Sequence, residues 1–172
     1  RVLIFSPHPD DDIISMGGTF QRLVDQGHDV HVAYQTSGNI AVADDEALRF
    51  IDFVVDYNHQ FYIDSPETIA NFNEAKKYLS DKKNSEVDNE VIRKVKGIIR
   101  RGEAKATCRH IGIPSINVHF LDMPFYETGT IQKKPLSQID IDIVKNTIEK
   151  VRPHQIYAAG DLADPHGTHK VC

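Results

Sequence analysis

The first eighteen residues combine a short apolar segment with a strongly polar loop. Residues 2–5 read Val-Leu-Ile-Phe, with no alternation of polar and apolar side chains, which is typical of a strand buried on both faces of a parallel sheet. Residues 6–12 then contain two prolines, one histidine and three consecutive aspartates, and a helical pattern of apolar side chains follows from Met16. This order of strand, loop and helix predicts an open α/β sheet, in which ligands bind at the carboxyl ends of the strands.

The polar loop carries side chains that suit a metal ion. His8 and Asp11 are three positions apart and can turn toward one point, while Asp10 between them projects elsewhere. Pro7 and Pro9 restrict the backbone, so the loop should be stiff. A buried group of carboxylates takes up protons unless a cation neutralises it. The alternative interpretation is a solvated turn whose aspartates cap the next helix.

A second polar loop follows a second predicted strand near the other end of the chain. Residues 155–159 form that strand, and the loop after it contains His166 and His169. The two histidines have the spacing i, i+3, so both can face one site if a helix begins there. One of them, with His8 and Asp11, would give two nitrogens and one oxygen, a ligand set of catalytic zinc that leaves a position for water.

These motifs resemble those of a known family. The run Pro7-His8-Pro9-Asp10-Asp11, together with the pair His166 and His169, looks like the LmbE/PIG-L family of zinc-dependent N-deacetylases, which act on N-acetylglucosamine-type amides. A third match begins at Arg100-Arg101-Gly102-Glu103-Ala104, which is similar to the family's R-x-x-E-x-x-x-A helix, although Thr107 stands at the last Ala position. The family's T-x-G-E loop corresponds to residues 36–39, where Asn39 replaces Glu.

The resemblance implies a fold, a reaction and a role for each matching residue. The reaction is removal of an acetyl group from an N-acetylglucosamine-type substrate by metal-activated water. Zn²⁺ would be bound by His8, Asp11 and His169. Asp10 would be the general base, and His166 would protonate the leaving amine or help to hold the oxyanion. Arg100 would contact the substrate or order a loop.

Two other functions remain open at this point. In the first, Asp10 and Asp11 join Asp122, which follows another predicted strand, in a magnesium-dependent phospho-receiver that signals and does not catalyse. That interpretation leaves the histidines unused, and imidazole suits zinc whereas oxygen ligands suit magnesium. In the second, the chain is a non-catalytic metal-binding domain within a fusion to a sugar-phosphate isomerase-like domain.

The remaining periodicity predicts an α/β, Rossmann-like parallel sheet flanked by helices, within a single domain over residues 1–172. The expected helices are 15–25, 44–56, 66–79, 87–111 and a helix from Ser137 to 151; further strands are expected at 30–34 and 116–121. Residues 40–87 are expected to form a helical insertion over the open side of the site. Its ring-bearing residues Tyr57, His59, Phe61 and Tyr62 are expected to form a small core, with stacking on sugars as the alternative.

Composition limits the partners and the compartment. The net charge is −5, with 20 basic against 25 acidic residues, which argues against nucleic-acid binding. The apolar stretches are strand-length, so no membrane span is expected. Cys108 and Cys172 form no disulfide framework, so a cytoplasmic location is expected. The chain starts at Arg1 and stops shortly after the second loop, so we expect an excerpt of a longer protein, truncated relative to the full family fold. The resemblance implies a small amino-sugar substrate and a possible fused sugar-phosphate isomerase-like domain.

Overall fold

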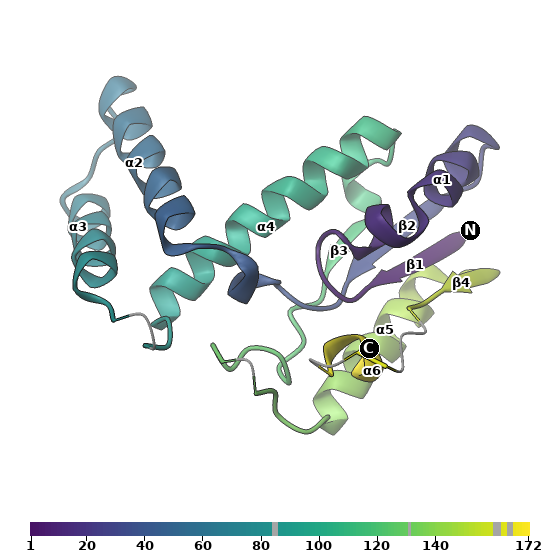
Figure 1. The fold of residues 1–172 in the computed structure, drawn as a ribbon. Helices are drawn as coiled ribbons and strands as arrows, with labels where there is room; N and C mark the ends of the chain where they lie inside the picture. The colour runs from purple at the N-terminus through teal and green to yellow at the C-terminus, as the bar shows by residue number, and fades with distance from the viewer. Residues whose placement is uncertain (84–85, 131, 160–162, 165–166) are drawn as a thin grey trace.

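The computed structural model describes residues 1–83, 86–130, 132–159, 163–164 and 167–172. Within these residues, four parallel strands form one sheet in the order β3-β2-β1-β4 (Figure 1). The strands are β1 (Val2–Ser6), β2 (Val30–Tyr34), β3 (Val118–Phe120) and β4 (Gln155–Tyr157). Strands β2 and β3 extend to one side of β1, and β4 lies on the other side. The order reverses between β1 and β4, which is where open α/β sheets bind ligands.

The central strand β1 is buried along its whole length, as its apolar sequence predicts. Val2 and Ile4 face one side of the sheet, and Leu3 and Phe5 face the other. Strands β3 and β4 are shorter than expected. A 3-10 turn, η2 (Ser115–Asn117), precedes β3, and the Asn117 side chain donates to the carbonyl oxygen of Val30 at 3.1 Å. Residues 115–117 form this turn, so the strand begins only at Val118.

Helices cover both faces of the sheet (Figure 1). Helices α1 (Asp11–Asp25) and α4 (Glu90–Ile111) cover one face, where Phe20 and Ala104 lie in the core with Val2 and Ile4. Helix α5 (Gln138–Val151) covers the other face. The expected α/β Rossmann-like class is confirmed. Among the described helices, none has the length and apolar character needed to span a bilayer.

Helix α1 begins four residues earlier than the predicted Ser15. Its first residue is Asp11, and Met16, with φ −143°, interrupts the helical backbone. Acidic side chains in a first turn are stabilised by the partial positive charge of the helix N-terminus. Asp11 and Asp12 occupy that turn. The polar loop and the start of the helix therefore overlap.

The segment expected to be a helical insertion contains a short 3-10 turn and two helices. These are η1 (Asn39–Ala41), α2 (Asp44–Gln60) and α3 (Pro66–Asp81), close to the expected bounds. The two helices pack against the N-terminal half of α4, beyond the end of the sheet (Figure 1). The aromatic side chains do not form a core, because Tyr57, Phe61 and Tyr62 are 47%, 58% and 94% exposed. The expectation of a small aromatic core is therefore wrong.

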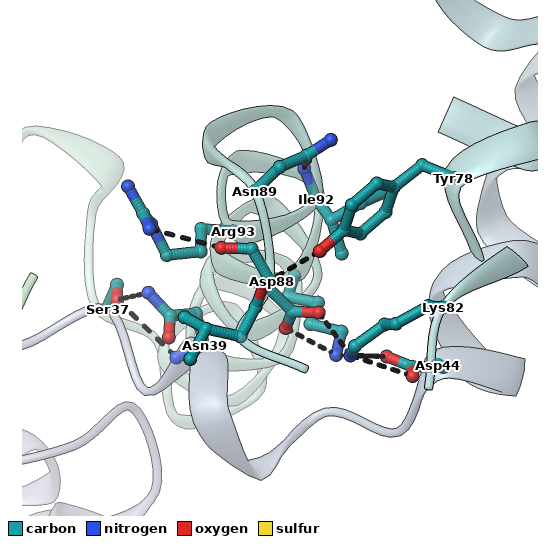
Figure 2. A network of polar contacts seen from close by, with 11 residues as sticks. Ser37, Asn39, Asp44, Tyr78, Lys82, Asp88, Asn89, Ile92 and Arg93 are labelled. Carbon is teal, nitrogen blue, oxygen red and sulfur yellow. Dashed lines mark hydrogen bonds and ion pairs between the residues drawn. The ribbon is translucent and has the colours of Figure 1, made fainter. Parts of the chain in front are cut away.

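A group of four charged side chains joins the insertion to α4. The ammonium groups of Lys82 and Lys96 each contact carboxylate oxygens of both Asp44 and Asp88, at 2.5 to 2.8 Å. Figure 2 shows Asp44 and Asp88 on either side of the Lys82 ammonium. Burial lowers the pKa of Lys82, but its bonds to the two carboxylates outweigh this and raise the pKa above its usual value. The start of α2 and the end of α3 are thus fixed to α4.

Candidate metal centre

Three side chains from the two polar loops meet at one point. His8 follows β1, Asp11 begins α1, and His169 lies in α6 (Thr168–Val171), after β4. The distances are 3.0 Å from His8 Nδ1 to Asp11 Oδ2, 3.1 Å from His8 Nδ1 to His169 Nε2, and 3.2 Å from His169 Nε2 to Asp11 Oδ2. Tetrahedral zinc with bonds of roughly 2.0–2.1 Å keeps its ligand atoms about 3.3 Å apart. The three donor atoms therefore fit one such ion.

The loop after β1 is held by bonds to neighbouring backbone. The Ser6 hydroxyl donates to the carbonyl oxygen of His8 at 2.6 Å, and the His8 N–H donates to Asp11 Oδ2 at 2.8 Å. The hydroxyl of Thr36, which follows β2, donates to the carbonyl oxygen of Pro7 at 2.7 Å. Because Pro7 also fixes its own φ, the loop presents His8 and Asp11 from a defined backbone.

The surroundings of Asp11 favour its ionised form, which is the form that binds a metal. Burial alone would raise the pKa of Asp11. The hydrogen bonds from the ring and backbone of His8, together with the charges of His8 and His169, hold that pKa below its usual value. Asp164 supports the third donor, because its carboxylate accepts the backbone N–H of His169 at 2.8 Å. Each of the three donor residues is partly buried.

The three consecutive aspartates have three different environments. Asp10 forms an ion pair with Arg100, with Nη2 and Oδ2 2.7 Å apart. Asp11 meets the histidines. Asp12 is buried on the sheet side of the helix, where its carboxylate accepts the Tyr34 hydroxyl at 2.8 Å, and burial raises its pKa. The run Asp-Asp-Asp therefore supplies one carboxylate beside the candidate metal centre, one donor to it, and one buried acceptor behind it.

Arg100 reaches this site from the middle of α4. Its guanidinium also contacts Glu103, one helical turn away, at 2.6 Å. Burial opposes the charge of Arg100, but the ion pairs with Asp10 and Glu103 raise its pKa. The loop after β2 lies close to it: Gly38 has φ +64°, and a Cβ there would stand 3.2 Å from Arg100 Nε and 2.8 Å from Pro9 Cδ. Arg100 thus contacts the candidate base, and its contact with substrate stays a prediction.

A pocket of about 440 Å³ opens over the three donors. Its lining includes Tyr126 and Lys133, which sequence reasoning did not single out. The Tyr126 ring is 3% exposed and meets the His8 ring edge-on, with centroids 5.7 Å apart. Burial raises the pKa of Tyr126 to about 12, so its hydroxyl stays protonated at neutral pH. Tyr126 lies in the loop after β3, and no motif in the sequence analysis pointed to it.

The insertion contributes less to the pocket than expected. Among the described residues, Ile40 and Ala41 of η1 line it, and no side chain of α2 or α3 does. The expectation that the whole insertion covers the site is therefore wrong. The charge group described above and apolar packing instead hold α2 and α3 against the N-terminal half of α4.

The loop at residues 36–39 contacts a carboxylate even though Asn39 replaces the Glu of the family motif. The Asn39 amide donates to Ser37 Oγ at 2.9 Å and to Glu127 Oε2 at 3.1 Å. Glu127 belongs to the loop after β3, so its carboxylate comes from another part of the chain. This contact could not be predicted from the motif alone.

Two residues from the sequence interpretation are not part of the cluster that the structure describes. His166, the expected proton donor, lies outside the described residues. Asp122, which a phospho-receiver would need beside Asp10 and Asp11, instead forms an ion pair with Arg101. Among the described residues, the cluster with metal-ligand spacing consists of His8, Asp11 and His169.

Comparison with known proteins relates this geometry to a family. The family model described as PIG-L, GlcNAc-PI de-N-acetylase, matches residues 3–172. A "putative glucosamine-6-phosphate deaminase-like protein" of Bacteroides thetaiotaomicron is 55% identical over 174 residues, covering 100% of this chain, which spans only 26% of that relative's length. The "diacetylchitobiose deacetylase" of Thermococcus kodakarensis is 44% identical over 46 residues, 27% of this chain and 17% of that protein. No solved structure matches the chain. Because the family model matches almost every residue, the chain belongs to the PIG-L (LmbE-like) family.

Proposed function

We propose that this chain is a zinc-dependent hydrolase that removes the acetyl group from an N-acetylglucosamine-type substrate. The observation that carries the proposal is the triangle of donor atoms from His8, Asp11 and His169, with Asp10 beside it in the same pocket. Two imidazoles and one carboxylate are a ligand set of catalytic zinc. The triangle also stands where the strand order reverses, the usual ligand position in such sheets.

The proposed amide hydrolysis assigns roles to Asp10 and Arg100 of the pocket and to His166, which lies outside the described residues. A zinc ion at this site would polarise the amide carbonyl and lower the pKa of water to about 7. Asp10 accepts the proton of the attacking water as general base. Arg100 orients the Asp10 carboxylate through the ion pair at 2.7 Å. His166 donates a proton to the leaving amine.

The names of the related proteins support an amino-sugar substrate. The family description, the Thermococcus protein and the Bacteroides protein are all named for a glucosamine derivative. The Bacteroides name refers to deamination, but this chain spans 26% of that protein. We propose that the remainder of such a longer protein provides a sugar-phosphate isomerase-like domain, and that the part described here hydrolyses the amide.

Measurement of both acetate and ammonia separates amide hydrolysis from deamination. We expect acetate release from N-acetylglucosamine derivatives, loss of that activity with a zinc chelator, and its return with added Zn²⁺. Asp10→Asn should keep the bound metal and release no acetate, whereas His59→Gln, at an exposed position on α2, should match the unaltered protein. Acetate release that persists in Asp10→Asn, or ammonia release without acetate, would contradict the proposal.

A magnesium phospho-receiver is less consistent with these residues. Two of the three clustered donors are imidazole nitrogens, whereas magnesium prefers oxygen ligands. Metal analysis of protein purified without chelator tests this directly. Bound zinc supports the hydrolase, and magnesium alone contradicts it.

A further inference from the structure

Lys133 is a cation of the pocket that has no role in the reaction proposed above. Its side chain is half-buried, and its Nζ lies 3.7 Å from the centroid of the Tyr126 ring and donates to the carbonyl oxygen of Thr130 at 3.1 Å. Among the described residues, no carboxylate oxygen lies within 4.0 Å of this Nζ. Arg100, the other cation of the pocket lining, has two such partners. Lys133 therefore lacks the close counter-ion that Arg100 has.

The environment of Lys133 leaves room for a negatively charged ligand. Burial lowers the pKa of Lys133, and the charge of Glu127 opposes that shift without forming an ion pair with it. Partial desolvation of an ammonium group is unfavourable unless an opposite charge or a ring face compensates for it. The Tyr126 ring supplies part of that compensation. An anionic group of a ligand would supply the rest.

Tyr126 also relates Lys133 to the candidate metal centre. The Tyr126 ring, which contacts the Lys133 ammonium, also lies edge-on to the His8 ring, with centroids 5.7 Å apart. One aromatic ring therefore separates the ammonium from a metal-donor residue. Lys133 and the three donor residues line the same pocket, so one ligand in that pocket can contact both. A sugar whose amide meets His8, Asp11 and His169 would present its other end to Lys133.

We propose that Lys133 binds an anionic substituent of the amino-sugar substrate, and that Tyr126 holds the ammonium in place for it. This inference rests on the proposed function, because it assumes that the acetamido group lies at the donor triangle. The shared chemistry is a group with anionic oxygens, which a phosphate ester or a carboxylate provides. Lys133 is then a residue that determines substrate specificity, and it takes no part in bond breaking.

The test compares charged and neutral substrates in three proteins. The substrates are N-acetylglucosamine, its 6-phosphate, its 1-phosphate, and N-acetylmuramic acid, which carries a carboxylate. The proteins are the unaltered chain, Lys133→Gln and the matched control Lys134→Gln, whose side chain is exposed. A charge-assisted hydrogen bond corresponds to a preference of roughly 10- to 100-fold. We expect kcat/KM to favour at least one anionic substrate by that factor, through a lower KM.

Lys133→Gln should abolish that preference, and Lys134→Gln should retain it. The anionic substrate with the largest loss identifies whether a phosphate or a carboxylate is bound, and at which position of the sugar. If the unaltered protein deacetylates all four compounds equally well, or if Lys133→Gln keeps the preference, the assignment of Lys133 is wrong while the proposed function stands.

A binding measurement separates failure of this inference from failure of the proposed function. Calorimetry with glucosamine and glucosamine 6-phosphate needs no turnover. Tighter binding of the phosphate that disappears in Lys133→Gln supports the anion site even if no acetate is released from any substrate. Equal binding of both compounds, together with equal turnover of neutral and anionic substrates, would overturn it.

Discussion

Nη2 of Arg100 lies 2.7 Å from Oδ2 of Asp10, so helix α4 places a positive charge against the polar loop that follows β1. The same helix holds α2 and α3 at its N-terminal half through buried side chains and the charge group at Lys96. Helix α4 therefore connects the insertion with the candidate base.

Replacement of Arg100 by Met should lower kcat and leave the metal bound. Without the guanidinium, the Asp10 carboxylate loses the group that orients it, and a well-placed general base contributes roughly 10²- to 10⁴-fold. We expect a fall in kcat of about 10- to 100-fold, since Asp10 itself remains. Steady-state kinetics and metal analysis measure both quantities. Arg109→Met, at an exposed position on the same helix, is the control, and an unchanged kcat in Arg100→Met would contradict this role.

Removal of a donor residue should remove the metal. Asp11→Ala and His169→Ala each remove one of the three donor atoms, which lie 3.0, 3.1 and 3.2 Å from one another. Atomic absorption on dialysed protein should show one zinc per chain in the unaltered protein and far less in either variant. His154→Ala changes a histidine outside the triangle and should keep the metal. Full metal content in both triangle variants would show that the ion binds elsewhere.

The stability of the metal-free protein should fall as the pH drops below about 6.5. His31 and His119 lie on β2 and β3, their rings stack with centroids 5.4 Å apart, and Nδ1 of His31 is 3.1 Å from Nε2 of His119. Burial lowers the pKa of both, and Asp29 opposes the shift at His31 only in part. Below their usual value of 6.5, the unfolded chain binds more protons than the folded one, so the free energy of unfolding decreases.

Urea unfolding of the metal-free protein at pH 7.5 and 5.5 measures this effect. His119→Gln should reduce the difference in unfolding free energy between the two pH values. The substitution removes one titrating ring and also the ring that stacks on His31. His110→Gln, exposed near the end of α4, should retain the full difference. The same pH dependence in both variants would assign the effect to other groups.

Loss of one charge from the partly buried group of Lys82, Lys96, Asp44 and Asp88 should destabilise the protein. Lys96 is 4% exposed and contacts both Asp44 and Asp88. Lys96→Met leaves two carboxylates with Lys82 as their shared cation. Breaking a fully buried ion pair costs about 3–5 kcal/mol, and because the Asp44 side chain is 42% exposed, we expect a smaller loss of about 1–3 kcal/mol. Lys94→Met removes an exposed pair with Glu90 and should cost less than about 1 kcal/mol. Denaturant unfolding measures the free energy of unfolding of both variants. Equal losses in Lys96→Met and Lys94→Met would show that the four-residue charge group contributes little to stability.

The class of the fold and the identity of the two polar loops could be predicted from the order of residues alone. The apolar residues 2–5 predicted a buried parallel strand, and the helical periodicity placed α2 and α5 close to their observed positions. These inferences succeeded because the spacing of side chains along a helix or strand decides which face is buried. The prolines and acids of the first loop likewise identified a candidate metal site before any contact was known.

The contacts of each aspartate in the first loop, and the residues that complete the pocket, depend on how distant elements pack together. The three aspartates are neighbours in sequence, yet their contacts differ. Asp10 contacts Arg100, Asp11 contacts the two histidines, and Asp12 accepts a hydrogen bond from Tyr34. Their partners depend on which elements lie beside β1, namely β2 and β4 in the sheet and α4 on one face. Tyr126 and Lys133 enter the pocket for the same reason. Contacts between distant residues follow from the order of the strands, and no local pattern in the sequence specifies that order.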